Sequence, residues 1–379
     1  MLLWKVRLLG KGILGIVLIT CLIFLSKGVI YGQDIYKIGA VLQMTGSAGS
    51  YGPLFKSGCE LAMEDINAQG GIKDKKLEIL FEDSRSLPTA AIAAMKKLCA
   101  IDKVPAVIMG GSGLVLASAS VANGNKVVLV NGAALSPKIK EAGEYVFSSI
   151  SDASVEVKWM AEYLIKKRGI KKVALFYLNN EMGLGAKDEF EKEFLKNGGH
   201  IVAIESHEEN TTDVRTQLAK IKSAKPEAVY LASHHKESGL VMKQAGIMGV
   251  KTKDIPWFSF APMEGPATIE LGGAAAEGIV YTAPAFDPTG PDPKMREFGE
   301  KYKKKYGNLP GLYSATMYDG VQLIAWGISN STYSGEGIKI ALEKVKDFPG
   351  VSGRITIDQH AVIGPIILKT VRDGKFVRY

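Results

Sequence analysis

The stretch "AVIMGGSGLVLASAS", from Ala106 to Ser120, contains an apolar run, a glycine turn and a run of small residues. The run "AVIM" predicts a buried strand, and "LVLASAS" after the turn predicts a helix. A buried strand followed directly by a helix is the repeating unit of a parallel sheet with helices on both faces. The stretch therefore predicts an α/β fold, and its turn is a candidate binding site.

The alternation of strand and helix continues on both sides of this stretch. Earlier and later strand patterns are "YKIGAVLQ", "KLEILFED" and "KVVLVNGA", with helix patterns at "LFKSGCELAMEDINAQGG" and "TAAIAAMKKLCA". After "SSISDAS" the pattern restarts, with strands predicted at "KVALFYLN", "HIVAIESH" and "EAVYLAS" and helices between them. Two doubly wound, flavodoxin-like lobes are therefore expected, which also suits a chain of 379 residues.

The last third of the chain contains helix patterns without strands between them, at "MREFGEKYKKKYG", "SATMYDGVQLIAWGIS" and "GEGIKIALEKV". We expect these helices to complete the first lobe. The final "GPIILKTVRDGKFVRY" predicts a hairpin that turns at "RDGK". The chain then crosses between the lobes near Ser149, Pro284 and Pro349, which predicts a hinge. The expected lobes are 33–149 plus 285–348, and 150–284 plus 349–379.

The first 32 residues have the three parts of a secretory signal. Basic residues precede the apolar run from Ile13 to Leu25, and the small Gly32 follows. We expect cleavage near Gly32 and a periplasmic protein. The apolar run is shorter than the ~20 residues of a spanning helix, which argues against a membrane anchor. Lipidation at Cys21 is a weaker alternative, because the residues flanking this cysteine fit a lipoprotein signal poorly.

Charge and cysteine content exclude several kinds of site. The predicted signal carries half of the formal net charge of +8, so no nucleic-acid partner is expected. Cys59 and Cys99 remain, in predicted helices on opposite faces of one sheet, so we expect two buried, unpaired thiols. No spacing of histidines or cysteines is typical of a metal site, and no cofactor is expected.

The turn between Gly110 and Gly113 does not match a catalytic or nucleotide-binding motif. Leu116 stands where a dinucleotide fingerprint has its third glycine, and the chain has no P-loop sequence. Leu114 replaces the last glycine of a nucleophile elbow, and no histidine has a recognisable catalytic partner. We therefore expect no catalytic residues and no enzymatic activity.

The same turn does suit a carboxylate. The Ser112 hydroxyl and the backbone N–H groups of residues 113–115 stand at a predicted helix N-terminus, which favours an anion. Ala133 and Ala134 end the next parallel strand, so their N–H groups are expected beside the turn. The alternative is a tight turn in which Ser112 only caps the helix.

These residues carry a resemblance to a known family. The stretch "YKIGAVLQMTGSAGSYGPLFKSGCELAMEDINAQGGIKDKKLEILFEDS", together with "AVIMGGSG", "VLVNGAALSP" and "AAAEGIVYTAPAFDP", resembles the Leu/Ile/Val-binding proteins. These are periplasmic substrate-binding subunits of ABC importers with a type I periplasmic binding fold. The resemblance extends over nearly all of the chain after the predicted signal, and it implies a ligand held between two lobes that close over it.

The resemblance also implies the residues of the site. Ser112 and backbone groups at Ala133 would hold the ligand carboxylate, and Tyr51 would line the pocket. The complete set of candidate ligand-binding residues is Tyr51, Gly110, Gly111, Ser112, Ala133, Ala134, Leu135, Met182, His234, Phe260 and Tyr313.

Three departures from the family pattern bear on the ligand. Leu135 replaces a serine or threonine, His234 replaces a tyrosine, and residues 259–261 lack the acid that pairs with an ammonium group; Glu264 is the nearest. A buried ammonium group without a carboxylate is costly. The hypothesis is therefore a carboxylate ligand without an α-amino group, aromatic or branched. In the alternative for the adjacent histidines, one is exposed and the other structural.

The expected partners are the small carboxylate and the membrane permease of an ABC importer, and the expected state is a monomer. Three alternatives stay open: a binding protein specific for branched-chain amino acids, a protein that senses its ligand for a membrane receptor, and an exported hydrolase. Neighbouring permease and ATPase genes would favour import, and turnover of a bound ligand would favour the hydrolase.

Overall fold

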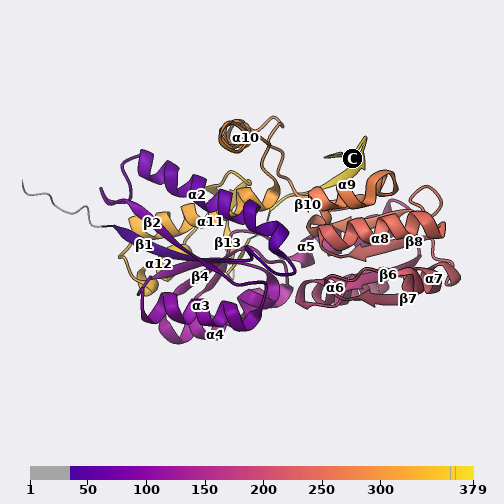
Figure 1. Cartoon of the computed structure of the whole chain (residues 1–379), viewed down its shortest axis with the longest axis horizontal. Helices are drawn as coiled ribbons and strands as arrows, with labels where there is room; N and C mark the ends of the chain where they lie inside the picture. The colour runs from indigo at the N-terminus through magenta and orange to yellow at the C-terminus, as the bar shows by residue number, and fades with distance from the viewer. Residues whose placement is uncertain (1–34, 359, 363) are drawn as a thin grey trace, which may run out of the picture. The chain divides into compact units, whose positions relative to one another are not determined.

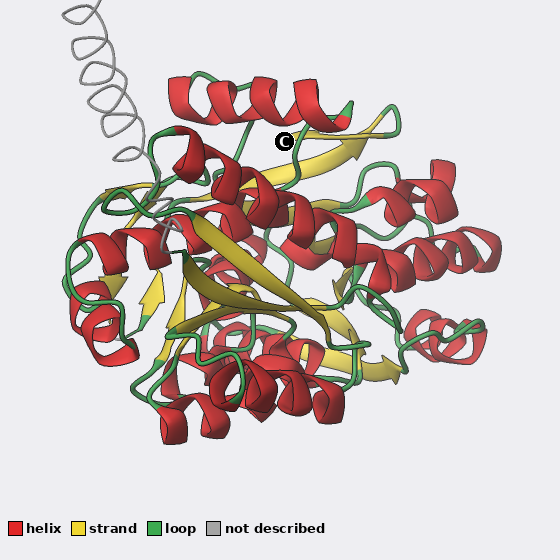
Figure 2. Cartoon of the chain, turned by 60° about the vertical axis from the view of Figure 1, so that its left-hand side comes forward, coloured by secondary structure: helices red, strands yellow, loops and turns green. Residues whose placement is uncertain are grey.

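The computed structural model describes residues 35–358, 360–362 and 364–379. The predicted signal, with Cys21 and Gly32, lies outside the described residues. From Tyr36 onward, the strands form two main sheets, each lying between helices (Figures 1 and 2). Within the described part of the chain, no helix combines the length and apolar character needed to cross a membrane.

The first sheet has five strands in the order β2-β1-β3-β4-β5, and all of its pairs are parallel. This order is the doubly wound, flavodoxin-like arrangement that the sequence predicts. The strands are β1 (Tyr36–Leu42), β2 (Leu77–Asp83), β3 (Ala106–Gly110), β4 (Val128–Ala133) and β5 (Val146–Ser148). No sequence pattern predicts β5, because three residues are too few to show one.

Helices cover both faces of this sheet (Figure 1). Side chains alternate along β1: Ile38 and Leu42 pack in the core that includes α2, and Val41 packs against α3. The helices of this lobe are α2 (Gly52–Ala68), α3 (Pro88–Ala100), α4 (Ser112–Asn125), α10 (Pro293–Tyr306), α11 (Leu312–Ser329) and α12 (Gly335–Leu342). As predicted, α11 packs on α2, β3 and β4, although it lies far along the chain.

The two described cysteines are unpaired, as predicted. Cys59 lies on α2 and is fully buried, and burial raises the pKa of its thiol. Cys99 lies on α3 and is only partly buried, which corrects the prediction of two buried thiols. The difference follows from their helices, because α2 lies under α11 whereas Cys99 is in the last turn of α3.

The second sheet has seven strands in the order β16-β15-β10-β9-β8-β6-β7. The pairs from β10 to β7 are parallel, and the β10–β15 and β15–β16 pairs are antiparallel. The strands are β6 (Lys172–Leu178), β7 (His200–His207), β8 (Ala228–Ala232), β9 (Trp257–Phe260), β10 (Val280–Pro284), β15 (Ile366–Arg372) and β16 (Lys375–Arg378). The last two are the predicted hairpin, with Asp373 and Gly374 at its turn.

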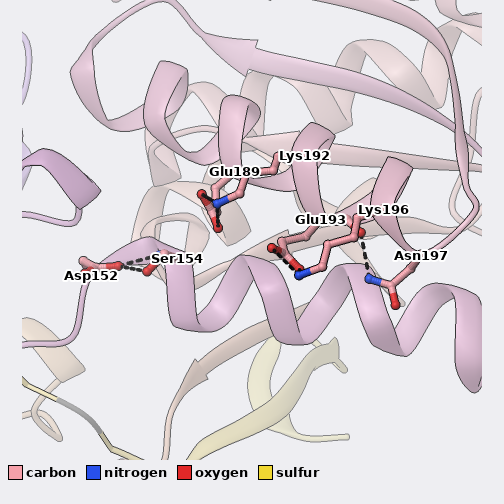
Figure 3. A network of polar contacts seen from close by, with 7 residues as sticks. All are labelled: Asp152, Ser154, Glu189, Lys192, Glu193, Lys196 and Asn197. Carbon is pink, nitrogen blue, oxygen red and sulfur yellow. Dashed lines mark hydrogen bonds and ion pairs between the residues drawn. The ribbon is translucent and has the colours of Figure 1, made fainter.

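The helices of the second lobe begin at side-chain caps where the sequence offers them. Asp152 accepts a hydrogen bond from the Ser154 N–H at 2.7 Å and starts α5 (Figure 3). Asn180 caps α6 in the same way, and on that helix Lys196 pairs with Glu193 near the C-terminus. The helices are α5 (Ala153–Lys166), α6 (Glu181–Lys196), α7 (Arg215–Ser223), α8 (His235–Met248) and α9 (Pro266–Gly272).

The chain passes between the two sheets in three places. It leaves the first sheet after β5 and returns after β10 to enter α10. Before β15 the chain forms two small pairs of antiparallel strands. In this segment the His360 carbonyl accepts a hydrogen bond from the Ser148 N–H of β5 at 3.0 Å. These pairs are β11 (Phe348–Pro349) with β12 (Arg354–Ile355), and β13 (Ile357–Asp358) with β14 (Ala361–Val362). These three connections are the segments about which the predicted hinge would rotate.

Candidate functional site

A small cavity lies between residues of the two lobes. Its volume is about 20 Å³, room for one water molecule. We call it the interlobe cavity. Its lining residues are Gln43, Tyr51, Phe55, Gly111, Ser112, Ala133, Leu135, Met182, His234, Pro262 and Tyr313. The structure thus brings together eight of the eleven candidate residues and adds Gln43, Phe55 and Pro262.

The cavity lies at the carboxyl ends of parallel strands. Gln43 follows β1, Gly111 and Ser112 follow β3, and Ala133 ends β4. From the other sheet, His234 follows β8 and immediately precedes α8. In open α/β sheets this edge is where ligands bind, because loops and helix N-termini meet there. The position therefore agrees with a ligand site.

The Ser112 hydroxyl can act toward a ligand only as a hydrogen-bond donor. Its oxygen accepts from the Leu135 N–H and from the Ser136 N–H, each at 3.1 Å. These bonds occupy both lone pairs, so the hydroxyl proton can only be donated, and the side chain faces the cavity. The helix N-cap is Gly111, not Ser112, so the alternative in which Ser112 only caps the helix is wrong.

The backbone donors differ from the prediction. The N–H groups of Leu114 and Val115 donate to the Gly111 carbonyl at 3.1 and 3.0 Å. Those of Ala133 and Ala134 donate to the Asn131 side-chain oxygen at 3.1 and 2.7 Å. These four groups are therefore unavailable to a ligand, which corrects that part of the prediction.

Two backbone N–H groups at the start of α4 remain without a partner among the described residues. They belong to Ser112 and Gly113, the first two residues of the helix, whose N–H groups have no acceptor one turn earlier in it. Together with the Ser112 hydroxyl, they give three donors beside one another at the positive end of a helix. This arrangement can hold a carboxylate.

Three candidate residues do not line the cavity. Gly110 is buried behind it, where an added Cβ would lie 2.7 Å from the Phe55 ring, so the glycine allows Phe55 to reach the cavity. Ala134 packs in the core on the other face of the sheet. Phe260 is fully buried and stacks on Tyr230, with ring centroids 6.4 Å apart.

Direct hydrogen bonds connect the lobes at the edge of the cavity. The Tyr51 hydroxyl donates to the Pro262 carbonyl at 3.0 Å and lies 3.3 Å from His234 Nδ1. The Ser50 hydroxyl lies 3.0 Å from His235 Nε2. Both histidines therefore contact the first lobe, and the alternative in which one of them is exposed is wrong, since His235 is buried and His234 is enclosed by these contacts.

The hydrogen-bond pattern suits neutral histidines. His234 Nε2 lies 3.4 Å from the Asn180 amide nitrogen, which can only donate, so the ring proton belongs on Nδ1, facing the Tyr51 oxygen. His235 Nδ1 is buried and has no partner among the described residues, so a second proton there would be unpaired. Burial lowers the pKa of each histidine to about 4.

No carboxylate lines the interlobe cavity among the described residues. Glu264, the nearest acid to residues 259–261, accepts from Lys369 Nζ at 2.5 Å and from the Tyr281 hydroxyl at 2.7 Å. Glu156 is fully buried and accepts from the Ala261 N–H at 3.1 Å. Burial raises its pKa to about 8, so this carboxyl group is largely protonated at neutral pH.

A second, larger cavity of about 690 Å³ shares Tyr313 with the interlobe cavity. It extends along the C-terminal hairpin and α9, and Glu264 and Lys369 lie in its wall. Tyr313 therefore separates the site beside Ser112 from a more open space. No cluster of three or more potential metal ligands is found in the described part of the chain.

One of the three missed residues could have been found from the sequence. Gln43 is the first polar residue after the first strand, and the carboxyl-end rule points to it. No sequence feature predicts Phe55 or Pro262 as site residues. Phe55 is an apolar residue of a helix, and Pro262 reaches the site only because it follows β9.

Comparisons with known proteins agree with this architecture. A family model described as "Periplasmic binding protein" matches residues 35–375. A Leu/Ile/Val-binding protein homolog from Brucella melitensis is 28% identical over 327 residues, covering 85% of this chain and 87% of that protein.

Two solved structures have the same fold. A branched-chain amino acid transporter substrate-binding protein from Streptococcus pneumoniae, in complex with isoleucine, is 28% identical with a TM-score of 0.83, covering 90% of this chain and 98% of that one. A solute-binding protein of an ABC transporter from Rhodopseudomonas palustris, in complex with 3,4-dihydroxybenzoic acid, is 25% identical with a TM-score of 0.83, covering 91% and 96%.

Proposed function

Because this chain belongs to the periplasmic binding protein family, we propose that it is the extracytoplasmic substrate-binding protein of an ABC importer. Residues 1–32 direct export and are cleaved near Gly32. The mature protein is a periplasmic monomer that delivers its ligand to a membrane permease. The lobes divide near Ser149 and Pro284, and the third crossing begins at Pro349.

The ligand is a small carboxylate that lacks an α-amino group. The observation that carries this proposal is the Ser112 hydroxyl, which accepts two backbone hydrogen bonds and can offer only its proton to the cavity. The unpaired N–H groups of Ser112 and Gly113 complete the carboxylate site. Charge-assisted hydrogen bonds of this kind are stronger than those between neutral groups.

The rest of the site argues against an ammonium group. No carboxylate lines the interlobe cavity among the described residues, and Glu264 already pairs with Lys369 and Tyr281. A buried ammonium group would therefore have no counter-ion. The relative in complex with 3,4-dihydroxybenzoic acid supports the same view, because its ligand is an acid without an amino group.

Binding is coupled to closure of the two lobes. A ligand stabilises the closed arrangement only through contacts that the open arrangement lacks. We place the ligand carboxylate at Ser112 of the first lobe and its remaining atoms toward Met182, His234 and Pro262 of the second, which requires the cavity of about 20 Å³ to widen. The contacts of Tyr51 with Pro262 and of Ser50 with His235 add to closure. The closed surface is what the permease recognises.

Calorimetry on the exported protein tests this ligand class. Leucine, valine, 4-methylpentanoate and benzoate would be titrated separately into protein purified from cells that express the full chain. Binding of an acid without an amino group, with weaker or no binding of the amino acids, supports the proposal. Tight binding of leucine or valine without binding of the other acids contradicts it.

A binding protein specific for branched-chain amino acids is the second candidate. It is favoured by the relatives named as Leu/Ile/Val-binding proteins and by the neighbour in complex with isoleucine. The calorimetric series separates the two candidates directly. Uptake of the radiolabelled ligand by cells with and without the gene then distinguishes import from sensing, and recovery of the unchanged ligand excludes hydrolysis.

A further inference from the structure

Gln43 has an unpaired side chain in the wall of the interlobe cavity. It follows β1, is only 8% exposed, and lines the cavity beside Ser112. Its carboxamide has no hydrogen-bond partner among the described residues, although the Ser112 hydroxyl in the same cavity wall is bonded. Unlike fully buried unpartnered atoms such as His235 Nδ1, the Gln43 amide atoms are accessible, so they can pair with a group that enters the cavity.

The carboxamide lies directly against the carboxylate site. A Cβ atom added to Gly111 would be 2.8 Å from Gln43 Oε1 and 3.1 Å from Nε2. Gly111 is the N-cap of α4 and immediately precedes Ser112 and Gly113, whose N–H groups are unpaired. A carboxylate held by these donors therefore places its next carbon atom, and the substituent on that carbon, beside Gln43.

The chemistry of a carboxamide selects among the substituents possible on that carbon. Its nitrogen donates and its oxygen accepts, so a hydroxyl group, which also does both, can pair with either end of the amide. A keto oxygen would leave the Gln43 oxygen unpaired. An ammonium group can only donate, would leave the Gln43 N–H groups unpaired, and would bring a charge that no lining residue neutralises.

We propose that the ligand is a 2-hydroxy acid and that Gln43 determines this specificity by pairing with its hydroxyl group. This inference rests on the proposed function, because it takes Ser112 and Gly113 as the carboxylate site. Phe55, Leu135 and Met182 give the cavity an apolar lining beside Tyr51, His234 and Tyr313, and a branched or aromatic side chain would contact them once the cavity of about 20 Å³ widens. Gln43 is thus a specificity residue beside the carboxylate.

Acids that differ only at the second carbon test the proposal. One set is 2-hydroxy-4-methylpentanoate, 4-methylpentanoate and leucine, and the other is 3-phenyllactate, 3-phenylpropionate and phenylalanine. For the skeleton that fits, we expect the hydroxy acid to bind at least about tenfold more tightly than the unsubstituted acid, because two hydrogen bonds are added. The amino acid should bind more weakly than either.

A variant at position 43 assigns the preference to this side chain. Gln43→Met keeps the length of the side chain and removes its hydrogen bonds, so the affinities for the hydroxy acid and the unsubstituted acid should become about equal. Gln69→Met, an exposed glutamine after the end of α2, is the matched control and should keep the preference. Thermal unfolding checks that both variants are folded.

The outcomes separate this inference from the proposed function. If the unsubstituted acid binds wild-type protein as tightly as the hydroxy acid, or if Gln43→Met keeps the preference, the role of Gln43 is wrong and the carboxylate site stands. If no acid without an amino group binds, both the carboxylate proposal and this inference are overturned.

Discussion

The two sides of the interlobe cavity are built differently. The first lobe contributes a hydroxyl and backbone N–H groups fixed at the start of a helix, where Ser112 also holds the N–H groups of Leu135 and Ser136. The second lobe contributes the His234 side chain, and His234 and the adjacent His235 lie within hydrogen-bond distance of Tyr51 and Ser50 of the first lobe. The first side is fixed before the lobes close, whereas the second is complete only after closure.

This difference separates what determines ligand class from what controls ligand retention. Under the proposed function, donors held by the first sheet would recognise a carboxylate in either arrangement of the lobes. The contacts of His234 and His235 exist only when the lobes meet, so they affect the equilibrium between open and closed forms. Four predictions test this division, and they are arranged by their expected effect on ligand affinity.

Acid should weaken binding most strongly, through the two histidines. Burial holds their pKa at about 4 in the closed form, against the ordinary value of about 6.5 when the lobes are apart. The open form therefore binds protons first. The equilibrium constant for closure is therefore highest above about pH 6.5. As the pH falls toward 4, it decreases by up to about tenfold per pH unit for each histidine.

Calorimetry between about pH 7.5 and pH 5.5 checks this prediction. Charged groups that face the pair are Glu209, Lys236 and Glu237, together with His207. His234→Gln and His235→Gln should each flatten the pH dependence, whereas His200→Gln, at an exposed histidine, should leave it intact. An affinity that does not change with pH in the wild-type protein contradicts the role of the histidines in closure.

Removing the Ser112 hydroxyl should have the next largest effect. Ser112→Ala deletes the donor to the ligand carboxylate and should weaken binding by about 1 kcal/mol or more. It also leaves the Leu135 and Ser136 N–H groups unpaired, each at a cost of about 1–3 kcal/mol to folding stability. Calorimetry and chemical denaturation measure the two effects separately.

Ser118→Ala is the matched control for this variant. Ser118 lies on the same helix, is also buried, and its hydroxyl has no partner among the described residues. Its removal should change neither ligand affinity nor stability greatly. Ser112→Thr, which keeps the hydroxyl, should restore most of the binding. Unchanged affinity in folded Ser112→Ala protein would remove Ser112 from the site.

The two sides of the cavity also differ in how well the sequence predicts them. Apolar strands and the carboxyl-end rule lead to Ser112 directly, and the motif resemblance adds Tyr51, Met182 and His234. The N–H groups of Ala133 and Ala134 were wrongly assigned to the ligand, because the Asn131 side chain binds them. A side chain that folds back onto its own turn leaves no periodic pattern, so only the structure reveals it.

Contacts between the lobes were the least predictable part. Pro262 is reached through its carbonyl group, which every residue type has, so nothing in the sequence distinguishes it. Glu264 could be recognised as the nearest acid. Its pairing with Lys369, however, depends on how β15 pairs with β10, a strand that begins more than 80 residues earlier in the chain. Such contacts depend on tertiary structure that local patterns do not contain.

A smaller loss of affinity is expected from Tyr51→Phe. The change removes the hydroxyl that donates to the Pro262 carbonyl at 3.0 Å, so closure loses about 1 kcal/mol. Tyr333→Phe is the matched control, because its hydroxyl also donates to a backbone carbonyl, that of Lys37 at 2.6 Å, away from the cavity. Stopped-flow measurements should show faster ligand release from Tyr51→Phe only. Equal release rates in the two variants contradict a role of Tyr51 in closure.

The smallest effect on binding should come from Phe260→Leu, although the sequence places this residue in the site. Its ring is fully buried against Tyr230 and does not line the cavity, so the change should cost about 1–2 kcal/mol of folding stability and leave ligand affinity unchanged. Phe55→Leu provides the comparison, because Phe55 is also buried but lines the cavity. This change should lower both the folding stability and the ligand affinity. Denaturation and calorimetry on the two variants separate packing from recognition. If Phe260→Leu weakens binding as much as Phe55→Leu does, the ligand reaches further into the second lobe than the cavity beside Ser112 indicates.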